Sequence, residues 1–256
     1  MDGIYDVTTL TAGQYSAVSN ILSFGFASML ATTIYLYLSQ ARVLPKYRQA
    51  IVISGTVTLI ALYHYWRIYD SFKAAAHIEG ETFNEAYRYV DWLLTVPLLL
   101  LETIAVLALP AANRKYLTAR LIPASAAMIV LGYPGEVTAE MGPKMMWGAL
   151  STIPFLYILY VLFVELTKSL DKQPAEVSAT VKRLRLLLIA TWGVYPISYL
   201  MPVLGIDGAD AFVGRQIGYT VADVLAKCLF GLTIYKIARL KSAADDASYA
   251  SSEGMH

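Results

Sequence analysis

The sequence predicts an all-α membrane protein, a bundle of seven transmembrane helices, and three observations support that fold class. First, 57% of the 256 residues are hydrophobic and only 15% are charged, whereas a soluble domain carries about 25% charged residues. Second, seven segments stay apolar over the ~20 residues that a helix needs to cross a bilayer. Third, the basic residues gather on alternate linkers between these segments.

The seven predicted helices follow one another along the chain. In order, they cover residues 14–40, 47–72, 83–109, 116–134, 144–168, 179–203 and 212–238. The linker at 73–82, with Gly80 at its centre, has room for a short hairpin between the second and third helices. Because no repeat or second domain is visible, residues 1–241 are expected to form one domain, and the Ser-, Ala- and Asp-rich residues 242–256 a disordered cytoplasmic tail.

The basic residues also predict the orientation of the bundle. Fourteen of the 20 Lys and Arg residues fall on one set of linkers, which the positive-inside rule assigns to the cytoplasm. Only Lys73, Lys144 and Arg215 fall on the opposite set. The N-terminus is therefore expected outside and the C-terminus inside, and this requires an odd number of spans.

The composition also limits which partners and covalent links the chain is expected to have. A net charge of +1 without a basic run argues against a nucleic-acid partner. The single cysteine, Cys228, excludes an internal disulfide. No metal site is expected, and the lipid bilayer is the expected surrounding.

The third predicted helix carries charged residues inside an apolar run. A charge near the bilayer centre costs about 2.5 to 3.5 kcal/mol, so such residues are functional candidates. Asp91 and Thr95 are four residues apart and share one helix face. Glu102 returns to that face ~16 Å further along, and Arg88 lies about one turn before Asp91. This spacing predicts a relay of proton-carrying groups through the membrane.

The seventh predicted helix carries Asp223 and Lys227, again four residues apart and in mid-span. One interpretation is a buried ion pair that joins two helices. The other is a Schiff base between a desolvated lysine amine and an aldehyde. A protonated imine is a buried cation, and Asp223 together with Asp91 would supply its counterions.

The directions of these two helices order the groups across the membrane. Both run from outside to inside, so Asp91 and Asp223 lie on the outer side of Lys227, and Glu102 lies on the cytoplasmic side. Arg88 is outermost and favours both aspartates as anions. The apolar neighbours of Glu102 predict that it is protonated at rest. This order predicts outward proton transport.

The sixth predicted helix presents an aromatic face formed by Trp192, Tyr195 and Tyr199. Such a stripe is more often core packing than a cofactor site. Beside a lysine inside the membrane, it is also typical of a wall for a flat conjugated ligand. Pro196 removes one backbone hydrogen bond and allows a kink.

Three runs together resemble the microbial rhodopsins, and the resemblance extends over all seven predicted helices. They are Arg88-Tyr-Val-Asp91-Trp92-Leu-Leu-Thr95-Val-Pro97, Trp192-Gly-Val-Tyr195-Pro196 and Asp223-Val-Leu-Ala-Lys227. The resemblance implies all-trans retinal bound to Lys227 through a protonated Schiff base and isomerised by light. The Asp91, Thr95 and Glu102 pattern is similar to that of the outward proton pumps of the proteorhodopsin and xanthorhodopsin branch.

The resemblance also implies roles for individual residues. Asp91 would be the primary proton acceptor, Glu102 the proton donor and Asp223 a second counterion. His64, which by itself would be an ordinary satisfied polar residue, would share charge with Asp91. Further pocket positions carried over by the match are Trp92, Leu99, Met128, Gly132, Ser151 and Thr152.

Gly148 has two interpretations. Glycine is common where membrane helices pack closely. Xanthorhodopsin-like members have a glycine at this position, which leaves a lateral slot where a carotenoid antenna can lie. In one respect the chain departs from the archaeal pumps, because Arg215 and Gln216 stand where those have an outer carboxylate. Glu136 and Glu140 remain as outer carboxylates.

The leading hypothesis is a light-driven outward proton pump of the cell (inner) membrane, with retinal and possible carotenoid chromophores. Such a protein is a transporter of protons and not an enzyme. The resemblance implies a homo-oligomer, a pentamer or trimer. The alternative is a retinal photosensor that signals through a partner protein, but a sensor needs no cytoplasmic donor, and Glu102 favours the pump.

Overall fold

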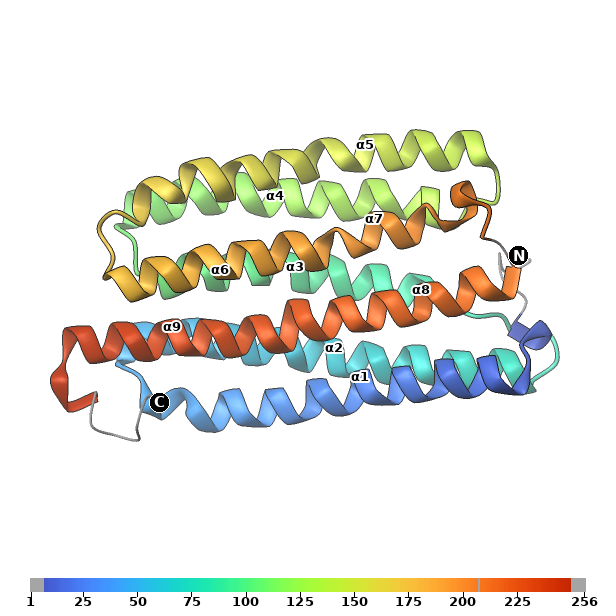
Figure 1. The fold of residues 1–256 in the computed structure, drawn as a ribbon, viewed down its shortest axis with the longest axis horizontal. Coiled ribbons are helices and arrows are strands. Elements are labelled where there is room, and N and C mark those ends of the chain that lie inside the picture. The colour runs from blue at the N-terminus through green and yellow to red at the C-terminus, as the bar shows by residue number, and fades with distance from the viewer. Residues whose placement is uncertain (1–6, 207, 250–256) are drawn as a thin grey trace.

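A computed structural model of the chain describes residues 7–206 and 208–249, and in this part all regular structure is helical. Figure 1 shows long helices lying side by side in a bundle. The α-helices are α1 Ala12–Ser39, α2 Pro45–His77, α3 Ala86–Val106, α4 Ala111–Glu136, α5 Met141–Tyr160, α6 Ala175–Trp192, α7 Val194–Tyr199, α8 Gly208–Asp223 and α9 Phe230–Asp245.

These helices form seven rods, which confirms the predicted fold class. α6 and α7 make one rod that is interrupted at Gly193, and α8 and α9 make another through the π-helical turns Val224–Leu229. Six rods in the described chain are continuous helices that are long and apolar enough to cross a membrane, whereas the break at Gly193 divides the seventh into two shorter helices. α1 begins at one end of the bundle and α9 finishes at the other (Figure 1), as an odd number of spans requires.

We name the two ends of the bundle by residues that lie there. The Glu136 end is the one where α4 finishes and α3 and α8 begin. The Lys241 end is the opposite one, where α3 and α9 finish.

Local signals explain where several helices begin and end. Thr11 caps α1 in a reciprocal capping box with Gln14, which satisfies two backbone N–H groups that would otherwise lack partners. α2 begins with Pro45 at its first turn, where the missing N–H group costs nothing.

The predicted hairpin after α2 is wrong. α2 continues to His77, past the predicted end at 72, because the run 73–76 is Lys followed by three Ala residues, all strong helix formers. The remaining connection, residues 78–85, contains no strand. Gly80, with φ of +83°, turns the chain toward α3.

The predicted start of the disordered tail also needs correction. α9 continues beyond residue 241 to Asp245. Its last turn is tied to α2, because the Leu44 N–H donates to Ser242 Oγ at 2.9 Å and the Tyr47 hydroxyl donates to Asp245. A short 3-10 turn follows at Ala247–Tyr249. Residues 250–256 of the predicted tail lie outside the described residues.

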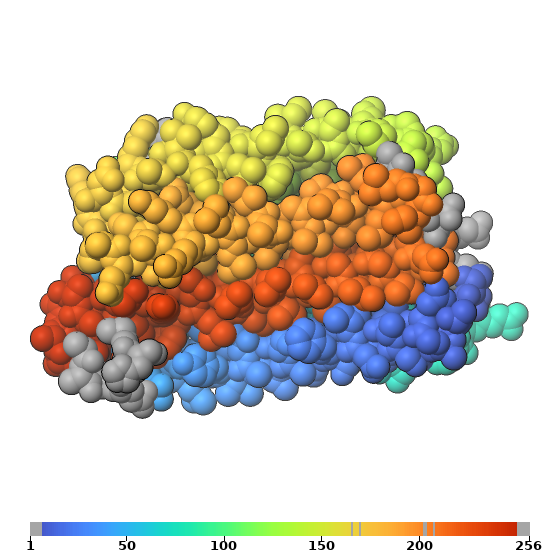
Figure 2. Space-filling view, viewed as in Figure 1, coloured from blue at the N-terminus to red at the C-terminus, as the bar shows by residue number. Residues whose placement is uncertain are grey.

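Close packing of α1 against its neighbours positions the centre of the bundle. A Cβ atom on Gly25 would lie 2.4 Å from Tyr65 Cε1 and 2.9 Å from Thr220 Cγ2, so only glycine permits this approach. α1 and the rod that contains α8 and α9 lie side by side along the face in view in Figure 2. The Tyr65 ring is fully buried in this packing, and its hydroxyl points to the centre of the bundle, where it donates to Asp223.

Candidate functional site

Lys227 lies at the centre of the described bundle and is only 2% exposed. It belongs to the π-helical turns between α8 and α9, a wider winding that often occurs at functional sites. Its Nζ donates to Asp91 Oδ2 and to Asp223 Oδ1, both at 2.7 Å. The structure therefore brings together the lysine and the two carboxylates that the sequence singled out on separate helices.

Besides Lys227, three residues donate hydrogen bonds to Asp223 and Arg88 forms an ion pair with it. The Tyr195 hydroxyl and Trp92 Nε1 donate to its Oδ1 at 2.6 and 3.2 Å. The Tyr65 hydroxyl donates to Oδ2 at 2.9 Å, and Arg88 Nη1 lies 3.7 Å away. Hydrogen bonds to a carboxylate stabilise its charged form, so this set favours Asp223 as a fixed anion.

Asp91 is held more loosely. Its Oδ1 makes no hydrogen bond to any described residue. His64 Nδ1 lies 3.8 Å from that oxygen, but it also lies 2.9 Å from Ile60 O. A carbonyl can only accept, so the Nδ1 hydrogen points at Ile60. Thr95 donates to the backbone oxygen of Asp91 at 2.9 Å and not to the carboxylate.

Arg88 completes the charge balance of the site. It is 1% exposed, and its Nη2 donates to Gln216 Oε1 at 2.6 Å. The guanidinium also faces the rings of Tyr65 and Tyr219, each with its centroid 5.5 Å away. Two buried cations thus face two buried carboxylates, which offsets the cost of taking each charge out of water.

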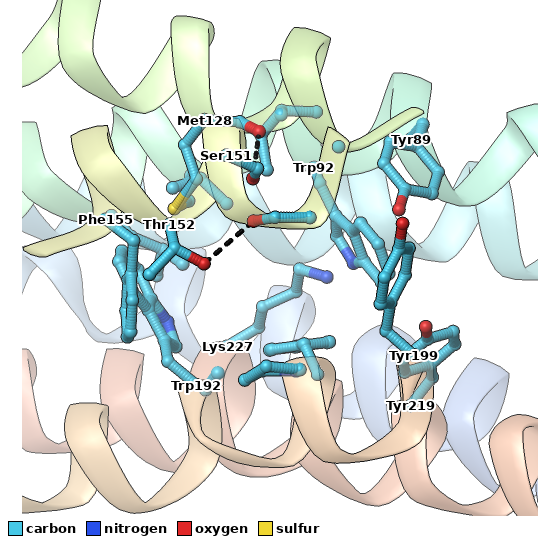
Figure 3. A pocket seen from close by; sticks show the side chains of 18 residues that line it. Tyr89, Trp92, Met128, Ser151, Thr152, Phe155, Trp192, Tyr199, Tyr219 and Lys227 are labelled. Atoms are coloured by element: carbon cyan, nitrogen blue, oxygen red, sulfur yellow. Dashed lines mark hydrogen bonds between the residues drawn. The ribbon is translucent and has the colours of Figure 1, made fainter. Parts of the chain in front are cut away.

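An apolar cavity of ≈ 140 Å³ adjoins the Lys227 side chain. One water molecule needs only ~10–15 Å³ by the same measure. In Figure 3, Phe155 and Trp192 lie toward one end, Tyr89, Tyr199 and Tyr219 toward the other, and Lys227 points in between them. The lining residues are Tyr89, Trp92, Val96, Leu99, Met128, Ile129, Gly132, Gly148, Ser151, Thr152, Phe155, Trp192, Tyr195, Pro196, Tyr199, Tyr219, Ala226 and Lys227.

Polar groups in the cavity wall are turned to the backbone. Ser151 Oγ donates to Met128 O at 2.7 Å and Thr152 Oγ1 to Gly148 O at 2.8 Å, the two contacts dashed in Figure 3. With these hydroxyls satisfied, the wall is mainly apolar, and Lys227 supplies its one amine among the lining residues. The cavity therefore fits a flat apolar molecule with a carbonyl that can condense with the amine.

Glu102 lies apart from this site, on the side toward the Lys241 end. Its side chain is completely buried. Ser54 Oγ lies 2.5 Å from its Oε2, and Oε1 has no hydrogen-bond partner among the described residues. This carboxyl is thus isolated in apolar packing, in contrast to Asp223.

A second charged cluster lies at the Glu136 end. Arg215 is fully buried between Glu136 and Glu85, with its Nη2 3.0 Å from Glu85 Oε1. The Tyr89 hydroxyl donates to Glu136 Oε2 at 3.2 Å. Lys144, also buried, donates to Gly135 O at 2.8 Å. Glu140, the other outer carboxylate in the sequence, is exposed at the start of α5.

Every pocket position carried over by the sequence resemblance lines the cavity, including Leu99, Gly132, Gly148 and Pro196. Sequence reasoning missed several neighbours. Tyr219 could have been found because it lies four residues before Asp223, on the same helix face. The others are Ser54, Tyr65, Tyr89 and Phe155.

Comparisons with known proteins agree with this geometry. The family model described as bacteriorhodopsin-like protein matches residues 16–240. The chain is 32% identical to the green-light absorbing proteorhodopsin of Gamma-proteobacterium EBAC31A08 over 238 residues, 91% of this chain and 90% of that one. It is 33% identical to the bacteriorhodopsin of Halobacterium salinarum over 221 residues, 84% of this chain and 81% of that one.

Solved structures are similar over nearly the whole chain. Xanthorhodopsin, described as a light-driven ion pump with dual chromophore, has a TM-score of 0.87 at 48% identity and covers 92% of this chain and 97% of its own. Thermophilic rhodopsin has a TM-score of 0.88 at 44% identity and covers 92% and 98%. With its apolar helices, this chain is a multi-pass protein of the cell membrane. It belongs to the bacteriorhodopsin-like family and is a microbial rhodopsin of the proteorhodopsin and xanthorhodopsin branch.

Proposed function

We propose that the chain is a light-driven outward proton pump in which Lys227 would hold retinal. The observation that carries the proposal is the position of Lys227 Nζ, buried beside an aromatic cavity and 2.7 Å from two carboxylates. A buried lysine needs compensating charge, and here it has two anions arranged unequally. Retinal, when bound, supplies the absorption of light and the change of shape that drive the cycle.

The difference between the two aspartates supports Asp91 as the proton acceptor. Asp223 would lose the benefit of its donors if it were protonated, because Tyr65, Trp92 and Tyr195 all donate to it. Asp91 Oδ1 has no hydrogen bond to give up. A proton that leaves the Lys227 nitrogen is therefore bound at lower cost by Asp91, and Asp223 keeps its negative charge.

The contacts of Ser54 support Glu102 as a donor that is protonated at rest. Ser54 Oγ lies 3.2 Å from Ala50 O and 2.5 Å from Glu102 Oε2. One hydroxyl hydrogen makes a full hydrogen bond to only one of these oxygens. If Glu102 is protonated at Oε2, it donates to Ser54 while Ser54 donates to Ala50 O, so Oε2, Oγ and the Ala50 carbonyl each have a partner.

The outward direction rests on the positions of these groups and on the basic linkers. Asp91 lies toward the Glu136 end from Lys227, and Glu102 lies toward the Lys241 end. The basic linkers at the Lys241 end assign it to the cytoplasm. Release toward Asp91 and resupply from Glu102 then move protons outward.

The decisive experiment measures the pH of an unbuffered suspension of cells that express the chain with added retinal, in light and dark. Acidification in light that a protonophore abolishes is the expected result. Alkalinisation that the protonophore enhances would mean that another ion moves first. A coloured sample without any pH change would point to the photosensor alternative.

We also propose a carotenoid antenna as a second chromophore. Gly148 lines the cavity, and a Cβ atom there would lie 3.1 Å from Tyr199 Cε1, so a larger side chain would occupy the space beside the Tyr199 ring. The xanthorhodopsin relative is described as having a dual chromophore. The excitation spectrum of pumping by carotenoid-loaded protein should show carotenoid bands, and Gly148→Trp should remove them while retinal absorption remains.

The homo-oligomer, a pentamer or trimer, is part of the same proposal. Its mass in detergent, measured by light scattering after size exclusion, would distinguish the two assemblies from a monomer.

A further inference from the structure

A buried lysine that the pumping scheme does not use lies at the Lys241 end. Lys241 is 6% exposed, and its Nζ donates to Leu107 O at 2.8 Å and to Gln173 Oε1 at 2.6 Å. Gln173 Nε2 in turn donates to the same carbonyl at 3.4 Å. These three groups form a closed set, which we call the Lys241 clasp.

The clasp joins three parts of the chain that are distant in sequence. Leu107 O is a carbonyl at the end of α3, where the helix leaves its last carbonyls without internal partners. Gln173 lies just before Pro174, the residue that caps α6. Lys241 lies in the last turns of α9, and its ammonium also faces the Tyr47 ring of α2 at 5.2 Å. The end of α3 is thus bound to the start of α6 mainly through one ammonium group, whose two hydrogen bonds are shorter than the direct Gln173–Leu107 contact.

The clasp lies over Glu102 in the direction of the solvent. Leu107 follows Glu102 by five residues, ~7.5 Å along α3. Tyr47 precedes Ser54 by seven residues, two turns on the same face of α2 and ~10 Å away. Between the two levels, the described side chains include fully buried apolar residues. These are Ile51, Val106, Ile234 and Ala238.

A cavity lies on the other side of Gln173. It has a volume of ≈ 290 Å³, and its lining includes Ala108, Asn113 and Lys172 as well as Gln173. Asn113 and Lys172 are exposed, so solvent reaches this cavity. Gln173 therefore lines a cavity that is open to solvent and also contacts the ammonium of Lys241, with Glu102 further inside.

We propose that Lys241 is a positioning residue which closes the proton entry to Glu102. The proposal rests on the function of Glu102 as the proton donor. Once Glu102 has lost its proton, it must be recharged through an apolar layer, and the start of α6 must move away from the end of α3 to admit water. The contact between Lys241 and Gln173 opposes that movement, so it sets the rate of recharging.

The test compares Lys241→Met, which keeps the length of the stem and removes the charge and donors, with Gln173→Leu. Flash photolysis of the retinal-loaded protein, with a pH indicator dye in the medium, resolves the recharging of Glu102 from the earlier loss of the proton at the Lys227 nitrogen. Both variants should recharge roughly tenfold faster, the size expected for loss of one charge-assisted hydrogen bond. The earlier step should not change, and the double variant should be no faster than Lys241→Met.

Lys236→Met is the matched control. Lys236 is an exposed lysine on the same helix, so its removal changes the net charge equally without touching the clasp. Recharging in this variant should match the unmodified protein. An equal acceleration in Lys236→Met would assign the effect to surface charge and overturn the proposal. Slower or unchanged recharging in Lys241→Met would overturn it as well.

Hydrogen exchange in the dark tests the clasp without relying on pumping. Loss of the clasp should increase the exchange of amides around 173–178 in Lys241→Met and in Gln173→Leu, but not in Lys236→Met. Unchanged exchange would mean that the clasp does not hold the start of α6. If exchange increased while recharging did not, the contact would exist but would not control proton entry. If Glu102→Gln left recharging unchanged, the donor assignment would fail, whatever the exchange data said.

Discussion

The two halves of the bundle treat buried charge in opposite ways. From Lys227 toward the Glu136 end, charged groups follow one another, with Asp91, Asp223 and Arg88 first and Arg215 with its glutamates beyond. From Lys227 toward the Lys241 end, the one buried carboxyl among the described residues is Glu102, with Ser54 as its hydrogen-bond partner. A proton leaving Lys227 therefore meets acceptors on one side and an apolar barrier on the other. Proton release toward the Glu136 end therefore needs little rearrangement, whereas proton uptake from the Lys241 end needs the bundle to open.

Removal of Lys227, which lies between the two halves, should have the largest effect of the changes considered. Lys227→Ala should abolish visible absorption completely, because no other amine lines the described cavity. The absorption spectrum of purified protein reconstituted with retinal checks this, with Lys236→Ala as a control that should keep its colour. A coloured Lys227→Ala sample would contradict the assignment of Lys227 as the residue that holds retinal, and with it the comparison of the two halves.

The charged half should depend on its ion pairs for stability. Arg215→Gln leaves Glu85 and Glu136 without their shared cation, and breaking a buried pair costs about 3–5 kcal/mol. Thermal unfolding in detergent should show a large loss, and Lys115→Gln, an exposed change of equal charge, should show almost none. If the two variants unfolded alike, the cluster at the Glu136 end would not be a stabilising feature.

The apolar half should depend on Glu102 for its kinetics. Glu102→Gln should slow the return of a proton to the Lys227 nitrogen by about a hundredfold, the usual contribution of a positioned proton donor. Flash photolysis should find the preceding deprotonation nearly unchanged, since the acceptor lies in the other half. An equal slowing of both steps would show that the halves are coupled more tightly than their geometry implies.

Ser54→Ala should have a smaller effect on the rate of proton donation from Glu102. Once Glu102 is ionised, Ser54 is the hydrogen-bond donor within reach, and a buried hydrogen bond contributes about 1 kcal/mol. Proton donation should slow by roughly fivefold. The double variant with Glu102→Gln should be no slower than Glu102→Gln alone. An additive double variant would place Ser54 in a separate role.

The sequence predicted those parts of the site that depend on one helix. The spacing of Asp91 and Glu102, and of Asp223 and Lys227, follows directly from the helical period. Because a buried cation at Lys227 needs counterions, Asp91 was expected to lie beside Asp223 and Lys227. The seven rods followed from hydropathy in the same way, although the end of α2 did not, because helix propensity carried it through the predicted hairpin.

Contacts between distant segments could not be predicted from these periods. Glu85, Glu136 and Arg215 come from three separate helix ends, and the sequence carries no signal for their register. The same holds for Lys241, which the charge count assigned to a cytoplasmic linker but which the structure buries. The hydroxyl of Thr95 was expected within the relay, yet it is used by the backbone of its own helix.

The interruption of the α6–α7 rod at Gly193 has a mechanical consequence. On one side of the break, Arg185 of α6 donates to Leu162 O of the preceding rod at 2.9 Å. On the other side, the Tyr195 hydroxyl of α7 donates to Asp223 Oδ1 at 2.6 Å. The two parts of the rod are thus fastened to different neighbours, so α6 can tilt about Gly193 while α7 keeps its place beside the site.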